Sequence, residues 1–219
     1  HGHHSKVFNL IRALRENLGD GFNIIAGSIA TPDAASFLKT AGANIFRIGV
    51  GGGSICSTRI QTGHGIPTLQ SIIDINNYFI STCEREEVTL IADGGIKNSG
   101  DMVKALAAGA DACMIGSLIS GTDECPGEVL VENGARYKVY RGMASIDVQK
   151  NKNNPRIEGI ATKVLCKGPV RDVLNQLRNG IESGLSYSGA RTIKELQNKA
   201  IFTEVSSNAA KENKPHIHD

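Results

Sequence analysis

The sequence contains no tryptophan, and only 5% of its 219 residues are aromatic. It also has no apolar run near the roughly 18 residues that a membrane-spanning helix needs, and no pattern of a signal peptide. The 24 Lys and Arg residues nearly balance the 22 Asp and Glu residues, for a net charge of +2. Such a balance gives no general affinity for nucleic acid or for a membrane surface, so we expect neither as a partner.

The five cysteines form an odd, scattered set without the CxxC spacing that is typical of zinc sites and redox motifs. This pattern favours free thiols in a reducing compartment, so we expect a cytoplasmic protein. Cys113 lies in the apolar run DACMIGSLI and is expected to be a small buried residue. We interpret Cys83, Cys125 and Cys166 in the same way, which leaves Cys56 to be considered separately.

Apolar runs of two kinds alternate along most of the chain. Short β-branched runs predict strands, and longer runs with helical spacing predict helices. The predicted strands are 23–29, 44–50, 88–96 and 112–118, and the predicted helices are 7–18, 31–43, 67–85, 99–110 and 170–189. Strands and helices that alternate in this way indicate βα units and a parallel sheet.

The strand ends favour one kind of parallel sheet. Each predicted strand runs into small or polar residues, namely AGS, GVGGG, ADGG and IGS. Because the C-terminal strand ends build the active site of a (β/α)8 barrel, we predict an α/β fold of the TIM-barrel type. An open, doubly wound sheet is the alternative. It is less favoured, since GVGGG is a poor dinucleotide-binding motif with no helix beginning inside it.

The chain changes character after Tyr140. Residues 141–163 are polar with little periodicity, and they predict a loop rather than part of the core. Within them, 144–163 is expected to form a mobile flap. Residues 206–219 predict a polar C-terminal tail, and no linker marks a second domain.

Two neighbouring strand ends have the composition of a phosphate site. ADGG covers 92–95 and IGS covers 115–117, one βα unit apart. Loops of this kind after late barrel strands turn backbone N–H groups toward a phosphate, so the pair favours a phosphorylated ligand over two unrelated tight turns. Asp93 could accept hydrogen bonds from ribose hydroxyls, with a helix cap or a loop hydrogen bond as the alternative.

The run GVGGGSICSTR places Cys56 on a glycine-rich loop instead of in an apolar strand. Glycine reaches φ > 0 without steric cost, and it lets a backbone approach a ligand closely. A thiolate attacks electrophilic carbon, and Arg59 could supply positive potential that favours the thiolate. From these residues alone, Cys56 is as readily an ordinary loop cysteine as a nucleophile.

Four stretches together carry a resemblance to a known family. GVGGGSICSTR, IADGGI, MIGSLISGTDECPGE and YRGMAS resemble the IMP dehydrogenase / GMP reductase family, in the same order and at similar spacing, and the opening HGHHS is also similar. The resemblance implies a (β/α)8 TIM barrel, of which this chain holds about the later half. We therefore expect residues 1–219 to be a single catalytic barrel domain that lacks the N-terminal part of the barrel. A homotetramer is also implied.

The resemblance assigns roles to individual residues. Cys56 would attack the purine C2 and form a covalent thioimidate adduct, while Thr58 and the flap residue Glu158 would assist proton transfer. The implied substrate contacts are Ser54, Gly95, Gly116, Ser117 and Tyr140 for the 5′-phosphate, Asp93 for the ribose, and Gly142, Met143 and Ser145 for the base. The implied cofactor contacts are Gly49 and Gly51, and the implied potassium ligands are the carbonyl groups of Gly51, Gly53 and Cys56.

Two activities share this chemistry in the family. A GMP reductase converts GMP to IMP with NADPH and releases ammonia, whereas an IMP dehydrogenase oxidises IMP with NAD and hydrolyses the adduct to XMP. Hydrolysis requires a base, which in dehydrogenases is an Arg-Tyr pair on a long flap. The segment 145–158 is short, and Arg156 is followed by Ile157, which favours the reductase. HGH, GTDECPGE, YRGM and the terminal HIHD are more typical of dehydrogenases.

Two other classes stay open at this point. A non-catalytic purine-nucleotide-binding half-barrel would keep the phosphate residues but would not need Cys56, Thr58 and Glu158 together. A flavin- or sugar-phosphate-binding barrel enzyme would share the glycine loops but would not account for GSICSTR or YRGM. The choice between NADPH and NAD is not made by the sequence.

Overall fold

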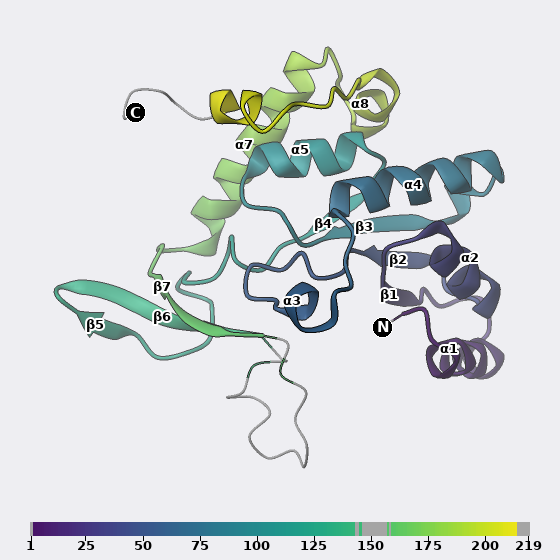
Figure 1. The fold of residues 1–219 in the computed structure, drawn as a ribbon, viewed down its shortest axis with the longest axis horizontal. Coiled ribbons are helices and arrows are strands. Elements are labelled where there is room, and N and C mark those ends of the chain that lie inside the picture. The colour runs from purple at the N-terminus through teal and green to yellow at the C-terminus, as the bar shows by residue number, and fades with distance from the viewer. Residues whose placement is uncertain (1, 143–144, 146–156, 158, 214–219) are drawn as a thin grey trace.

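Four parallel strands form the centre of the fold (Figure 1). The computed structural model describes residues 2–142, 145, 157 and 159–213. The strands are β1 (Ile25–Ile29), β2 (Ile45–Ile48), β3 (Thr89–Asp93) and β4 (Ala112–Met114), and they pair in that order. This sequential order lacks the reversal point of a doubly wound sheet and is that of consecutive barrel strands. Within the described residues, β1 pairs only with β2 and β4 only with β3, so both edges are open.

The helices that follow the strands form the core with them. These are α2 (Pro32–Ala41), α4 (Thr68–Ser81) and α5 (Ser99–Ala107), and α1 (Ser5–Leu18) precedes β1 and contacts α2. Phe46 of β2 and Phe79 of α4 are fully buried, with their rings stacked at a centroid distance of 5.5 Å. The predicted alternation of strands and helices is confirmed, and its driving force is the burial of these apolar faces.

Local signals set the ends of helix α2. The hydroxyl of Thr31 accepts a hydrogen bond from the amide of Ala34 (3.3 Å), and Pro32 occupies the first turn, where it loses no helical hydrogen bond. Gly42 ends the helix at φ 110°, a backbone angle that glycine adopts most readily. The helix predicted over 31–43 therefore forms, with ends that differ by one or two residues.

The observed strands begin within two residues of their predicted starts, but three of them end earlier. The runs predicted as 44–50, 88–96 and 112–118 are strands only over Ile45–Ile48, Thr89–Asp93 and Ala112–Met114. Gly49 has φ 140°, and Gly94 and Gly95 have φ 92° and 81°. These angles leave the extended region, so the glycines turn the chain out of the sheet and into the loops.

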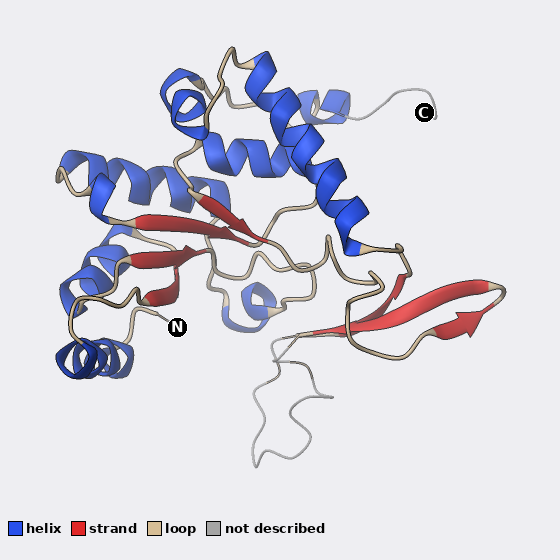
Figure 2. Cartoon of the chain, turned by 180° about the vertical axis from the view of Figure 1, so that it is seen from behind, coloured by secondary structure: helices blue, strands red, loops and turns tan. Residues whose placement is uncertain are grey.

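A second, antiparallel sheet extends from one end of the molecule (Figure 2). It contains β5 (Leu130–Glu132), β6 (Ala135–Arg141) and β7 (Ala161–Leu165), in that order. Asn133 and Gly134 join β5 to β6 with φ values of 51° and 78°, as in a two-residue hairpin turn. The Asn-Gly pair is typical of such a turn and was a sequence signal for this hairpin, which was not predicted.

The loop predicted over 141–163 is wrong at both ends. Arg141 ends β6 and pairs with Ala161, the first residue of β7. Each strand satisfies its backbone polar groups with a partner about twenty residues away, and local polarity carries no sign of that pairing.

Helix α7 (Val170–Tyr187), predicted over 170–189, packs closely on α5. A Cβ atom on Gly180 would collide with the side chain of Ser99, and one on Gly184 would lie 2.6 Å from Val103 Cγ2. The remaining elements are α3 (Thr58–Thr62), α8 (Ile193–Lys199), η1 (Arg85–Glu87) and η2 (Ala209–Asn213). No helix in the part of the chain that the structure describes is long and apolar enough to cross a membrane.

Candidate active site

The loops after β2 and β3 meet at the C-terminal edge of the parallel sheet. The amide of Gly95 donates a hydrogen bond to the carbonyl of Gly52 (2.7 Å). Gly49 lies so close to Asp93 that a Cβ atom at position 49 would collide with the Asp93 carbonyl oxygen. With φ 140° in addition, position 49 requires glycine. The glycine run therefore brings two loop backbones into direct contact.

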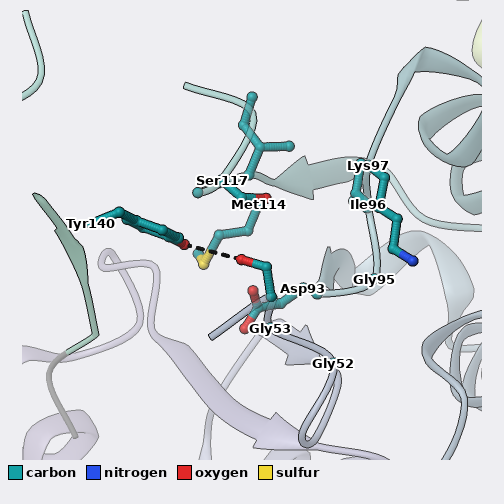
Figure 3. Close-up of a pocket in the computed structure, with 13 residues that line it drawn as sticks. Gly52, Gly53, Asp93, Gly95, Ile96, Lys97, Met114, Ser117 and Tyr140 are labelled. Atoms are coloured by element: carbon teal, nitrogen blue, oxygen red, sulfur yellow. Dashed lines mark hydrogen bonds between the residues drawn. The ribbon is translucent and has the colours of Figure 1, made fainter. Parts of the chain in front are cut away.

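A hollow of about 130 Å³, the Tyr140 hollow, opens between these loops and β6 (Figure 3). It is lined by Gly52, Gly53, Ser54, Asp93, Gly94, Gly95, Ile96, Lys97, Met114, Ile115, Gly116, Ser117 and Tyr140. The hydroxyl of Ser54 donates to that of Tyr140 over 3.5 Å, and a Cβ atom on Gly116 would lie 3.2 Å from the same Tyr140 oxygen. All five residues predicted to hold a phosphate thus line one small hollow.

A second hollow, of about 290 Å³, contains the cysteine and is called the Cys56 hollow. It is lined by Ser28, Arg47, Gly49, Val50, Gly51, Gly52, Gly53, Cys56, Thr58 and Asp93. Cys56 is exposed, and its thiol donates to Oγ1 of Thr58 over 3.1 Å. Thr58 is the buried first residue of α3. A reachable thiol with a fixed hydroxyl beside it is suited to nucleophilic attack.

Asp93 lies at the boundary of the two hollows, because it lines both of them. Its carboxylate accepts a hydrogen bond from Nε of Arg47 over 2.6 Å. The alternative role of Asp93 as a helix cap is wrong, since Asn98 caps α5. Arg47 was not among the predicted site residues, although a single charged residue inside the apolar run NIFRIGV was a signal for it. Arg47 balances the charge of Asp93 and fixes the orientation of its carboxylate.

A comparison with known proteins shows which family the chain belongs to. Residues 1–216 match the model of the IMP dehydrogenase / GMP reductase domain. The chain belongs to this family. It is 42% identical over 226 residues to the inosine-5′-monophosphate dehydrogenase of Halalkalibacterium halodurans, and 42% identical over 229 residues to the GMP reductase of Leishmania major. Each alignment covers 99% of this chain and 46% of the relative, so the chain spans less than half the length of these curated relatives.

A solved member of the family has the same fold. The GMP reductase of Trypanosoma brucei, in complex with guanosine 5′-monophosphate, superposes with a TM-score of 0.90 at 40% identity. The match covers 99% of this chain and 45% of that protein. The predicted α/β fold of the TIM-barrel type, only part of which is present in this chain, is therefore confirmed.

In this chain, Gly159 and Ile160 pair with the backbone of the loop that carries Cys56. Gly159 forms an isolated antiparallel bridge with Cys56, and the amide of Ile160 donates to the carbonyl of Ile55 over 3.0 Å. The backbone around Cys56 is thereby held by residues about one hundred positions later in the chain. Gly159 and Ile160, just before β7, therefore lie beside the loop that carries Cys56.

The residues assigned to the base are described only in part. Ser145 is fully buried, bridges Gly159, and donates its amide to the carbonyl of Gly142 over 3.0 Å. Its hydroxyl has no hydrogen-bond partner among the described residues. A buried hydroxyl without a partner is unfavourable, and Ser145 lines neither of the two hollows. The predicted site residues Met143 and Glu158 lie outside the described residues.

Arg59 closes the cysteine loop. Its Nε donates to the carbonyl of Val50 (3.3 Å) and its Nη2 to the carbonyl of Ile66 (2.9 Å). Its side chain also lies over Gly51, where a Cβ atom would overlap it. We therefore assign Arg59 to the closure of this loop.

The other cysteines differ from Cys56 in their surroundings. Burial raises the pKa of Cys113 to about 11, so this thiol stays protonated and unreactive near neutral pH. The expectation that Cys83 is buried is wrong, since it is exposed at φ 59° just after α4, whereas Cys113, Cys125 and Cys166 are half-buried. Among the residues that the structure describes, no three His, Cys, Asp or Glu side chains gather as metal ligands.

Proposed function

We propose that the protein is a purine-nucleotide oxidoreductase that acts at C2 of a purine 5′-monophosphate through a covalent adduct on Cys56. The observation that carries this proposal is that the Tyr140 hollow and the Cys56 hollow share Gly52, Gly53 and Asp93. A nucleotide laid across them would have its phosphate in the first hollow, its ribose at Asp93 and its base beside Cys56. The GMP complex of the Trypanosoma brucei relative supports such a ligand.

The phosphate would be held by three hydroxyl groups, those of Ser54, Ser117 and Tyr140, because hydroxyls donate well to phosphate oxygens. Gly95 would contribute space rather than a donor, since its amide is used by the carbonyl of Gly52. Gly116 would likewise leave room next to the Tyr140 hydroxyl. Lys97, which the sequence analysis did not select, lines the same hollow and would add positive charge.

The ribose and the base would use the groups nearest to Cys56. The carboxylate of Asp93, oriented by Arg47, would accept hydrogen bonds from the ribose hydroxyls. The base would lie next to Gly142, Met143 and Ser145, and the bridges of Gly159 to both Ser145 and Cys56 support this placement.

The chemistry would begin with attack of the Cys56 thiolate on C2. In the reductase direction the bond from C2 to the 2-amino group breaks, and ammonia leaves with a proton delivered through Thr58 and Glu158. C2 then accepts a hydride, which a reduced nicotinamide supplies, and the bond from C2 to sulfur breaks to leave IMP and a free thiolate. The 3.1 Å contact between the Cys56 thiol and the Thr58 hydroxyl supports Cys56 as the nucleophile and Thr58 as a proton-transfer group.

We favour a GMP reductase, which uses NADPH. The short segment 145–158 lacks the Arg-Tyr pair that would activate water for hydrolysis, since Arg156 is followed by Ile157. An IMP dehydrogenase, which uses NAD and makes XMP, is the second candidate, because relatives of both names are 42% identical to this chain. In either case Gly49 and Gly51 would lie on the nicotinamide side of the adduct.

The proposal also includes a bound potassium ion, a homotetrameric assembly and a cytoplasmic location. Potassium would bind to the carbonyls of Gly51, Gly53 and Cys56. The Gly53 carbonyl accepts the Cys56 amide over 3.1 Å, so it would bind the ion through its second lone pair. A homotetramer would be the assembled form. The five free cysteines support a reducing, cytoplasmic setting.

The deciding experiment offers the full-length protein GMP with NADPH in one reaction and IMP with NAD in another, and follows the absorbance of the reduced nicotinamide. Loss of NADPH with release of ammonia would establish the reductase. Formation of NADH and XMP would establish the dehydrogenase and would mean that a group other than an Arg-Tyr pair activates water. Silence in both reactions, with GMP still bound, would favour the non-catalytic nucleotide-binding half-barrel.

A further inference from the structure

Lys138 is a buried cation outside both hollows. It lies in the middle of β6 and is only 5% exposed. Its Nζ donates to three backbone carbonyls, those of Thr122 (2.9 Å), Asp123 (3.1 Å) and Cys125 (2.6 Å). An ammonium group has three donors and burying it is costly unless all of them are used. All three donors of Lys138 are therefore committed to one turn of the chain.

That turn is connected to one wall of the Tyr140 hollow. Gly116 and Ser117 line the hollow, and the chain then coils tightly toward Thr122. The amide of Ser120 donates to the carbonyl of Gly116 (3.0 Å), and the amide of Thr122 donates to the carbonyl of Ile119 (3.3 Å). A displacement of the turn at Thr122 would therefore be transmitted to Gly116 and Ser117.

The strand that carries Lys138 forms the opposite wall. Side chains alternate between the two faces of a strand, so Lys138 and Tyr140 project from the same face of β6 while Val139 projects from the other. Val139 is exposed, in keeping with this alternation. The hydroxyl of Tyr140 reaches Ser54 over 3.5 Å. Lys138 thus links the strand of Tyr140 to the loop of Ser117.

We propose that Lys138 is a positioning residue for the 5′-phosphate, an inference that rests on the proposed function and names a residue that it did not include. Lys138 does not touch the nucleotide. It sets the distance between the loop of Ser117 and the strand of Tyr140, and so makes the hollow the width of a phosphate. Lys167 supports the same loop from outside, donating from Nζ to the carbonyls of Ser117 (2.9 Å) and Leu118 (3.1 Å).

The test compares nucleotide with nucleoside in the full-length protein. In Lys138→Met, which keeps an unbranched side chain without the ammonium, we expect the affinity for GMP to fall about 10-fold or more, since the loss of one hydrogen bond to a charged phosphate lowers affinity by about that factor. Affinity for guanosine, which has no phosphate, should stay the same, as should kcat at saturating nucleotide. Calorimetric titration gives both affinities. Lys163→Met, an exposed lysine of the adjacent strand β7, is the matched control and should bind GMP normally.

A double-mutant cycle separates positioning from a general loss of stability. If Lys138 acts through Tyr140, the double variant with Lys138→Met and Tyr140→Phe will lose less binding free energy for GMP than the sum of the losses in the two single variants. Fully additive effects, or equal losses for GMP and guanosine, would overturn the inference.

Lys138→Gln serves if Lys138→Met fails to fold, since it keeps two neutral donors, and the same nucleotide-specific loss is expected. Failure of both variants to fold would assign Lys138 to stability alone and overturn the inference. Wild-type protein that binds no purine 5′-monophosphate would overturn the proposed function instead.

Discussion

The thiol of Cys56 donates to Oγ1 of Thr58, with 3.1 Å between the two atoms. Thr58 opens helix α3, where its carbonyl also accepts a hydrogen bond from the hydroxyl of Thr62 (2.8 Å). A short helix therefore fixes the hydroxyl, while the thiol stands on a glycine-rich loop that substrate can reach.

Replacing Cys56 by alanine should separate catalysis from binding. We expect Cys56→Ala to lower kcat by about 10³-fold or more, because loss of a covalent nucleophile commonly costs at least that much. Affinity for GMP should be nearly unchanged, since the groups that line the Tyr140 hollow are untouched. Steady-state rates and calorimetric titration measure the two effects. The control is Cys83→Asn, at an exposed cysteine whose φ of 59° asparagine tolerates. A Cys56→Ala protein that still turns over would rule out the covalent mechanism.

Thr58→Val should slow the chemical step without weakening nucleotide binding. The change keeps the shape of the side chain and removes the oxygen that accepts from Cys56. We expect kcat to fall about 10²-fold, the lower end of the usual contribution from a proton-transfer group. Thr58→Ser keeps the oxygen and should retain most of the rate. Equal rates for the two variants would show that the hydroxyl takes no part in proton transfer.

Asp93→Asn should weaken the recognition of ribose in particular. The variant loses the ion pair with Arg47 and the charge that would accept ribose hydroxyls. Because a hydrogen bond to a charged group contributes about 1.5–3 kcal/mol, we expect the Kd for GMP to rise about 10- to 100-fold. The GMP analogue that lacks the 2′- and 3′-hydroxyls of the ribose should bind to the wild type and to Asp93→Asn with the same Kd. A loss of the same size for that analogue would assign Asp93 to structure and not to the ribose.

Gly49→Ala should destabilise the protein far more than Gly63→Ala. Both glycines have φ in the left-handed region, at 140° and 70°, and that strain costs about 1–2 kcal/mol. Only at Gly49 would the new Cβ atom collide with a backbone atom, the carbonyl oxygen of Asp93; nothing lies within 4 Å at Gly63. We expect a loss above about 3 kcal/mol for Gly49→Ala in urea unfolding. Equal losses would mean that the loops after β2 and β3 can move apart freely.

Glu124 should make stability depend on pH in the acid range. Its carboxylate accepts the amide of Val170 over 2.8 Å at the start of α7, and chiefly this hydrogen bond holds the pKa of Glu124 below its ordinary value of 4.5. The folded pKa lies below the unfolded one, so the stabilisation is present above pH 4.5 and is lost as the pH falls through the folded pKa. The unfolding free energy of Glu124→Gln, measured against pH, should therefore fall less steeply than that of the wild type below pH 4.5. Glu128→Gln, at an exposed residue of the same loop, should decline as the wild type does.

Much of the parallel half of the fold was predictable because its signals are local. Apolar runs and caps such as Thr31 and Gly42 act within a few residues, and they placed the strands and the helices that follow them. The residues at the strand ends were predictable for a related reason. In a parallel sheet of βα units all the C-terminal ends meet at one edge, so residues far apart in the chain gather once the strands are located.

The remainder depended on contacts between segments that are distant in sequence. The second sheet forms because Arg141 pairs with Ala161, and the turn near Thr122 is held because Lys138 reaches it from another strand. The pairing of Arg47 with Asp93 spans two strands. Even where a residue is conspicuous in the sequence, as Arg47 is inside an apolar run, the residues around it do not indicate which partner it contacts.

The sequence by itself determined the order of the βα units, the glycines at the strand ends and the cysteine among them, because those features follow from propensity and spacing. Only the tertiary structure decided that the hollow beside Tyr140 and the hollow beside Cys56 meet at Asp93. It also decided that a buried lysine joins the two walls of the first hollow. The reason is physical: a site is an arrangement of distances between loops, and the core that sets those distances is formed by the whole chain.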